Sequence, residues 1–211
     1  MAVKDTKGTC SECGAQLTVR TAKKHLLASM KKRETAEQPS RLFLIKVEGY
    51  GYGNYHYWMY LLMPEHAKLR DLDKFLRKTW LECCGHLSQF RIGRGITIAM
   101  GKELGYVLQP SLEFLYDYDF GSTTTLKVSV AGIADGTVKK GKVEMVARND
   151  APSPKCDQCG EKATLICPQC MDDGVGWLCP SCSGKHDCGL GSFLPFVNSP
   201  RAGVCGYGYA G

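Results

Sequence analysis

The sequence predicts an α+β fold: a largely antiparallel sheet covered by one or two helices, with small zinc-stabilised modules at the N- and C-terminal ends. Three observations lead to this prediction. Strand-like segments outnumber helical ones, several strand-like segments follow one another directly, and cysteines gather near both ends of the chain. The 211 residues, 44% hydrophobic and 23% charged, are typical of a soluble globular protein.

The first strands of the core are expected at residues 41–47 and 55–63, which are rich in aliphatic and aromatic side chains. Gly49, Gly51 and Gly53 between them predict a flexible turn. Tyrosines in and around these segments either belong to the core or stack on nucleic-acid bases: Tyr50, Tyr52, Tyr55, Tyr57 and Tyr60.

A helix is expected over about residues 68–82, because apolar side chains recur there at helical spacing. Residues 112–120 alternate and predict a strand that places Leu112, Phe114, Tyr116, Tyr118 and Phe120 on one face. Residues 123–130 and 142–148 are two further strand-like segments. Adjacent strands of this kind favour antiparallel pairing.

Composition divides the chain into four parts. They are a zinc-knuckle-like segment with a basic helix (1–38), the α+β domain (41–148), a two-zinc cysteine module (153–190) and a Gly-rich tail (191–211). The linker over 149–154 contains two prolines within three residues and is expected to be stiff and extended.

The strongest chemical signal is the cysteine pattern in residues 156–188. Three Cys-x-x-Cys pairs are followed by His186-x-Cys188, which gives eight candidate ligands, the number that two tetrahedral zinc ions require. A full set of ligands indicates structural zinc, because a catalytic ion needs an open position. The predicted ligands are Cys156, Cys159, Cys167, Cys170, Cys179, Cys182, His186 and Cys188.

The pairing of these ligands is either sequential or crossed, and we favour the crossed arrangement. In it, the first and third Cys pairs share one ion, while the second pair, His186 and Cys188 hold the other. The spacing resembles B-box-like cross-braced zinc domains, although His186-x-Cys188 is tighter than their usual last pair. Cys205 is an alternative eighth ligand.

A third zinc site is predicted at the N-terminus, where Cys10, Cys13 and His25 resemble the first three ligands of a zinc finger. Glu34, a distant cysteine or water would complete it. The helix after Cys13 is basic and offers phosphate contacts, or else a solvated face. Its cations are Arg20, Lys23, Lys24, Lys31, Lys32 and Arg33.

The net charge of +6 lies mainly outside the C-terminal module. Residues 1–38 carry eight Lys or Arg against four Asp or Glu, whereas residues 152–211 carry four against five. Seven thiolates and two zinc ions would make the C-terminal module more acidic still and lower the net charge of the whole protein to about +3. If the protein contacts RNA or DNA, the contact is therefore expected from the N-terminal segment, and the C-terminal module is expected to meet protein.

Parts of the chain resemble the plasmid pRiA ORF-three-like family, which also includes passenger proteins of insertion elements. The likeness lies in residues 69–76 and 80–90, in the run 116–121 and in the tail 197–207. It implies an α+β domain but no established activity. The chain departs from the family after Gly121, where the usual Asp-x-Trp-x-His is absent.

The expected role is a non-enzymatic zinc adaptor for protein or nucleic acid, or a structural subunit of a larger assembly. The alternative is an enzyme with an acid–base or metal site at Asp117, Asp119 and His86, with His56 as a further candidate. A simpler interpretation makes Asp117 and Asp119 a polar strand face, His86 a structural residue, and Cys83 and Cys84 small buried residues.

The compartment is expected to be the cytoplasm, and no contact with a membrane is expected. The first nine residues lack the apolar core of a signal peptide, and no apolar run approaches the roughly 20 residues that span a bilayer. In such a compartment, clustered Cys-x-x-Cys pairs indicate metal binding rather than disulfides.

Overall fold

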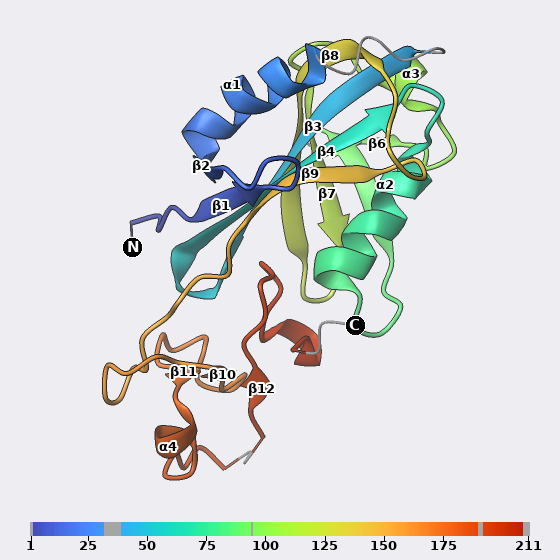
Figure 1. The fold of residues 1–211 in the computed structure, drawn as a ribbon. Helices are drawn as coiled ribbons and strands as arrows, with labels where there is room; N and C mark the ends of the chain where they lie inside the picture. The colour runs from blue at the N-terminus through green and yellow to red at the C-terminus, as the bar shows by residue number, and fades with distance from the viewer. Residues whose placement is uncertain (1, 32–38, 94, 190–191, 209–211) are drawn as a thin grey trace.

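The computed structural model describes residues 2–31, 39–93, 95–189 and 192–208 of the chain. Within these residues a large sheet carries the main core, and a smaller cysteine-rich part lies beside one end of it (Figure 1). The large sheet contains β1 (Lys7–Cys10), β2 (Gln16–Thr18), β3 (Ser40–Gly51), β4 (Tyr55–Pro64), β5 (Ser88–Ile92), β6 (Ile96–Ile98), β7 (Glu113–Tyr118), β8 (Thr124–Gly136) and β9 (Glu144–Asn149).

The strand order is β2-β1-β9-β4-β3-β8-β7-β5-β6, and the neighbouring strands pair antiparallel. The predicted antiparallel sheet is therefore confirmed. The N-terminal hairpin extends this sheet, because β1 pairs with β9 in the register Gly8↔Asn149 to Cys10↔Ala147.

The helical segments are α1 (Val19–Met30), α2 (Leu69–Leu76), α3 (Leu104–Val107) and α4 (Pro180–Ser183), with shorter turns at η2 (Tyr52–Asn54), η3 (Arg77–Leu81) and η4 (Val204–Gly206). Helix α2 continues into the π-helical turn η3, so the helix predicted over 68–82 is confirmed. Among the described residues, none of the helices is long and apolar enough to cross a membrane.

Strands β3 and β4 are buried on both faces of the sheet, which explains why their sequences are almost continuously apolar. In β4, Met59 and Leu61 belong to the core beneath α2, whereas Trp58 and Leu62 belong to the core beneath α1. Helices α1 and α2 thus cover opposite faces of the sheet (Figure 1). The predicted α+β class, with one or two covering helices, is confirmed.

Helix α1 forms and docks for local reasons. Thr18 and Thr21 make a reciprocal capping box at its start, which satisfies amide groups that a helix end leaves free. Ala22, Leu26 and Met30 are spaced by four residues and are buried on the sheet.

Two sequence predictions about the core were wrong in detail. Of the three predicted turn glycines, Gly53 lies in the turn, within η2, whereas β3 runs through Gly49 and Gly51. These two glycines leave room for Pro200, which approaches both. The strand expected to include Phe120 ends at Tyr118. Asp119 has a left-handed φ of 64°, which breaks the alternation and leaves Phe120 53% exposed.

The C-terminal part forms a second, smaller sheet from β10 (Leu165–Ile166), β11 (Trp177–Leu178) and β12 (Leu194–Pro195), in the order β11-β10-β12. Its core includes three of the cysteines themselves, Cys156, Cys167 and Cys179. Elements this short depend on further cross-links for stability.

Candidate metal centres

The cysteines gather into four groups with three of the five histidines. None of the twelve is in a disulfide, and the candidate ligand atoms of each group lie within 4.8 Å of one another. Zn–S bonds of about 2.3 Å place tetrahedral sulfur ligands about 3.8 Å apart, so the groups are compatible with zinc binding. They are Cys10, Cys13 and His25; Cys156, Cys159, Cys179 and Cys182; Cys167, Cys170, His186 and Cys188; and Cys83, Cys84, His86 and Cys205.

The N-terminal group lies on the β1–β2 hairpin and helix α1. Cys10 ends β1 and Cys13 lies in the turn, where the Gly14 N–H donates to the Cys10 carbonyl oxygen at 2.9 Å. His25 projects from α1, with its Nε2 3.4 Å from Cys13 Sγ. The described residues supply three ligand atoms here; Glu34, an expected fourth ligand, lies outside them.

The first C-terminal group joins two separate turns of the chain. Cys156 and Cys159 flank a tight turn closed by the Gly160 N–H, which donates to the Cys156 carbonyl oxygen at 2.9 Å. Cys179 precedes α4 and Cys182 lies within it. The sulfur atoms of Cys159 and Cys179 are 3.6 Å apart, too far for a disulfide and close to the edge of a zinc tetrahedron.

The second C-terminal group combines three thiols and one imidazole. Cys167 Sγ lies 3.5 Å from Cys188 Sγ, and Cys170 Sγ lies 3.2 Å from His186 Nε2. The other ring nitrogen, Nδ1, lies 3.2 Å from the side-chain amide of Gln158. For Nε2 to bind a metal, Nδ1 must carry the ring proton, so the Gln158 amide would have to present its oxygen here and accept from the Nδ1–H.

The two C-terminal groups interleave along the sequence in the crossed arrangement that the spacing favours. His186 and Cys188 lie together despite their tight spacing. Cys205, the alternative eighth ligand, lies instead with Cys83, Cys84 and His86. The binding of zinc to these groups stays a prediction.

The thiols of the first C-terminal group influence one another electrostatically. Burial raises the pKa of the Cys156 thiol, but hydrogen bonds from backbone N–H groups outweigh burial and lower the pKa to about 6. The neighbouring sulfur atoms of Cys159 and Cys179 raise the pKa of Cys182 to about 12. Four thiolates therefore repel one another here unless a divalent cation lies between them.

The C-terminal module packs against the hairpin between β3 and β4. The Gly176 N–H donates to the Tyr52 hydroxyl at 2.8 Å, and the Tyr52 and Trp177 rings lie 4.9 Å apart. Tyr55 also contacts Trp177, edge to face. Tyr57 and Tyr60 are buried in the core. Among the five candidate stacking tyrosines, Tyr50 is exposed, and its ring stacks on that of His56.

The predicted basic surface lies on α1, where four cations line a groove of about 570 Å³ together with Leu27 and Ala28. Among the described residues, none of these four basic side chains forms an ion pair with a carboxylate. Two other predicted cations, Lys32 and Arg33, lie outside the described residues. The four in the groove are Arg20, Lys23, Lys24 and Lys31.

The two aspartates of the enzyme hypothesis have different partners. Asp117 accepts hydrogen bonds from Arg91 Nε at 2.5 Å and from Thr125 Oγ1 at 2.8 Å. Asp119 instead contacts His86 and Arg201. Because the chain turns after β7, the expectation that both aspartates share a strand face was wrong.

The further histidine of that hypothesis, His56, belongs to yet another contact. Its Nε2 lies 3.0 Å from Glu48, a neighbour on the hairpin. The contacts of the described residues therefore do not assemble Asp117, Asp119, His86 and His56 into one site.

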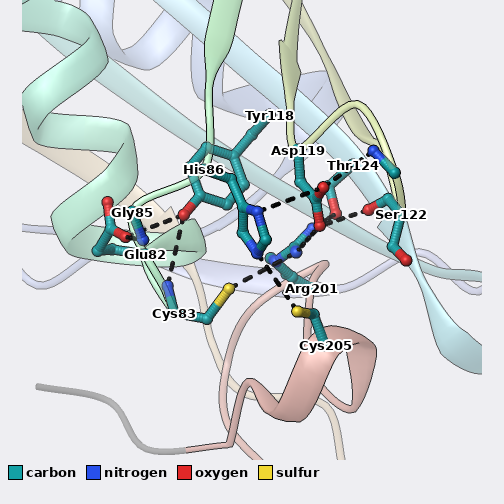
Figure 2. A network of polar contacts seen from close by, with 11 residues as sticks. Glu82, Cys83, Gly85, His86, Tyr118, Asp119, Ser122, Thr124, Arg201 and Cys205 are labelled. Atoms are coloured by element: carbon teal, nitrogen blue, oxygen red, sulfur yellow. Dashed lines mark hydrogen bonds and ion pairs between the residues drawn. The ribbon is translucent and has the colours of Figure 1, made fainter.

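Sequence reasoning missed a polar network around Arg201, which lies in the C-terminal tail (Figure 2). Its guanidinium is fully buried. It donates from Nη2 to Asp119 Oδ2 at 2.6 Å and from Nη1 to the Ser122 carbonyl oxygen and Thr124 Oγ1, both at 3.0 Å. The sequence of the Gly-rich tail does not predict that Arg201 is buried, because the residues that accept its hydrogen bonds are far away in the chain.

The same region contains the fourth group of candidate ligands. Cys83 is half-buried and Cys84 is exposed, so the expectation that both are small buried residues was wrong for Cys84. The His86 side chain contacts Asp119 and Cys205 (Figure 2). The spacing Cys-Cys-x-His was a signal in the sequence, but its partner Cys205 is more than a hundred residues away.

No protein-family model matches the chain, and no curated protein matches it. Among solved structures, it is similar to the crystal structure of a protein of unknown function from Methanosarcina mazei Go1. The sequence identity is 20% and the TM-score 0.45, and the likeness covers 60% of this chain and 78% of that one.

Proposed function

We propose that this protein is a non-enzymatic adaptor whose C-terminal module is held in shape by two zinc ions and presented to a partner. The observation that carries the proposal is the presence of two separate groups of four ligands each. Zinc bound by four protein ligands is structural, because no position remains for a substrate or a reactive water.

The build of the module supports a structural role for the metal. Its strands are two residues long, its helix has four residues, and its core is partly made of cysteines. Structural zinc contributes on the order of 10 kcal/mol, which is enough to fold a segment that cannot bury a core of its own. Thiolate ligands need a reducing compartment, so we infer a cytoplasmic location. Membership of the pRiA ORF-three-like family is likewise proposed on the motifs alone.

The proposal is tested by comparing partner capture from native cells by the zinc-loaded protein and by its Cys156→Ser/Cys179→Ser variant. Cross-linked partners are identified by mass spectrometry, and the large sheet is monitored by circular dichroism. The adaptor hypothesis expects a reproducible partner that is lost with the zinc while the sheet stays folded. Capture that is unaffected by loss of the module's zinc would contradict it.

A second candidate role is contact with the phosphate backbone of RNA or DNA through α1. The observation in its favour is the groove lined by Arg20, Lys23, Lys24 and Lys31. Cations on one helix face attract phosphates and release bound counterions, which makes affinity fall as salt rises.

Charge reversal at Lys23 and Lys24 tests this second role. If α1 contacts phosphates, Lys23→Glu/Lys24→Glu weakens binding to a mixed-sequence oligonucleotide at least tenfold and flattens its dependence on salt. The matched control is Lys74→Glu/Lys102→Glu, which makes the same charge change at exposed positions on and beside α2, on the opposite face of the sheet from α1. Equal weakening in both variants would contradict a specific role for α1.

A further inference from the structure

We propose that Cys83, Cys84, His86 and Cys205 form an additional zinc site that fastens the C-terminal tail to the α+β domain. This site is separate from the two-zinc module and does not depend on the adaptor role. Cys83, Cys84 and His86 come from the segment just after η3, and Cys205 comes from η4 in the tail. Figure 2 shows how Cys83, His86 and Cys205 lie.

The first argument is the ligand set itself. Three thiols and one imidazole make a Cys₃His set, one of the common structural zinc combinations. His86 Nε2 lies 3.3 Å from Cys205 Sγ, near the roughly 3.6 Å that tetrahedral Zn–N and Zn–S bonds imply. The arrangement also accounts for every cysteine of the chain that the three predicted zinc groups leave over.

The second argument is the contact behind His86. Its Nδ1 lies 3.5 Å from Asp119 Oδ1, on the opposite side of the ring from Cys205. A carboxylate at that nitrogen holds the proton on Nδ1 and leaves the Nε2 lone pair free for a metal, as in carboxylate–histidine–zinc triads. Asp119 is itself fixed by Arg201 and by the Gly121 N–H, which donates at 3.0 Å.

The third argument is the charge around the group. Three thiolates and one Zn²⁺ carry a net charge of −1, and Asp119 adds another negative charge. The buried Arg201 guanidinium contacts both, lying 2.6 Å from Asp119 Oδ2 and 3.6 Å from Cys83 Sγ. A cation of this kind stabilises the charged form of the site and also orients the carboxylate.

The backbone around the ligands is shaped to bring them together. Gly85, with φ of 78°, turns the chain between Cys84 and His86. Cys205 adopts a left-handed φ of 51°, an uncommon conformation for a residue with a side chain. A strained backbone conformation persists only where surrounding contacts hold it in place, and a bond from Cys205 Sγ to a metal ion would be such a contact.

A zinc ion here would join two parts of the chain that are 119 residues apart at His86 and Cys205. The cross-link lies beside the point where Arg201 enters the core. It would hold the tail against the domain and thereby restrain the module that precedes the tail. The site is more open to solvent than the module's sites, because Cys84 and Cys205 are exposed.

The test is the zinc content of the full chain, purified under reducing conditions with zinc supplied and measured by native mass spectrometry. Cys84→Ser/Cys205→Ser is expected to hold one zinc ion fewer per chain than the wild type. Leu87→Ser is the matched control, since Leu87 is 73% exposed and adjacent in sequence but offers no ligand. It is expected to keep the wild-type zinc count.

An unchanged zinc count in Cys84→Ser/Cys205→Ser would overturn the proposal, as would a disulfide among these cysteines in the reduced wild-type protein. Cobalt(II) gives an independent measurement. The wild-type minus variant spectrum should show tetrahedral cobalt with thiolate charge-transfer bands, and a featureless difference overturns the site. Loss of zinc from Cys156→Ser/Cys179→Ser reports on the two-zinc module alone, so the two proposals fail separately.

Discussion

Arg201 and Asp119 form a buried ion pair, with Nη2 and Oδ2 2.6 Å apart, that joins the C-terminal tail to the end of β7. The Arg201 side chain is fully buried and that of Asp119 is 6% exposed. Buried charges are tolerated when they are paired and hydrogen-bonded, and Arg201 also donates to Ser122 and Thr124. The tail is thus part of the folded domain rather than an appendage.

Arg201→Ala should strongly destabilise the protein, because it removes the partner of a carboxylate that stays away from water. We expect a loss of about 3 kcal/mol in the free energy of unfolding by urea, measured at a fixed free zinc concentration. Arg70→Ala, at an exposed position, should cost under about 0.5 kcal/mol. Similar losses in the two variants would show that the buried pair has no special role.

Removing zinc with a chelator should unfold the C-terminal module and leave the large sheet intact. Trp177 lies in the module, whereas Trp58 and Trp80 lie in the cores of the large sheet. Chelation should therefore change mainly the fluorescence of Trp177, with a smaller change at Trp80, which lies three residues before Cys83 of the proposed tail site. In Trp177→Phe most of this fluorescence change should disappear while the sheet's circular dichroism persists. A change of equal size in Trp177→Phe would mean that zinc loss reaches the main core.

Asp117 should make stability depend on pH in the acid range. Burial raises the pKa of this carboxyl group, but hydrogen bonds from Arg91 and Thr125 outweigh burial and hold the pKa below its usual value. A depressed pKa in the folded state stabilises the protein above the unfolded pKa of about 3.9. That contribution is lost as the pH falls through the lower, folded value.

Asp117→Asn is expected to lower the free energy of unfolding by about 1–3 kcal/mol near pH 7, which is the contribution of hydrogen bonds to a charged group. The difference in unfolding free energy between wild type and variant should shrink as the pH falls below about 4. Zinc release in acid affects both proteins, so the difference isolates the carboxylate. A difference that stays constant down to pH 2 would rule out this role for Asp117.

Gly49→Ala should weaken the attachment of the tail. A methyl group at residue 49 would lie 2.6 Å from a Leu126 methyl carbon and 3.3 Å from Pro200. Overpacking of this kind lowers the free energy of unfolding by about 1–3 kcal/mol. It should also raise the rate of amide hydrogen exchange in the tail around Arg201. Gly95→Ala is the control, because its added methyl group would meet open space. Equal exchange in the two variants would show that Pro200 does not need the space that Gly49 leaves.

The parts of the fold that sequence could predict are those encoded locally. The apolar runs of β3 and β4 and the helical spacing of α2 are visible in short windows of sequence, and antiparallel pairing follows from adjacent strands. Short strands were missed: β5 and β6, with five and three residues, have too few positions for a clear alternation. The register that adds β1 to β9 is set by contacts between residues 137 to 141 positions apart in the sequence.

The candidate metal groups also divide into those that local sequence spacing predicts and those that it does not. The two C-terminal groups were predictable because their ligands recur at Cys-x-x-Cys spacing within 33 residues. The group at Cys83, Cys84 and His86 was not, because its fourth member, Cys205, is joined to it only by the path of the tail. Arg201 was missed for the same reason, since its burial depends on Asp119 and Thr124 from another part of the chain.

The most direct test of the account is the zinc count of two double variants of the full chain, measured by native mass spectrometry. In the crossed arrangement, Cys156→Ser/Cys179→Ser damages one site and should lose one zinc ion, whereas Cys156→Ser/Cys167→Ser damages both sites and should lose two under competition from a chelator. If the second variant loses one ion and the first loses two, the pairing is sequential. If neither loses zinc, the module is not a zinc module.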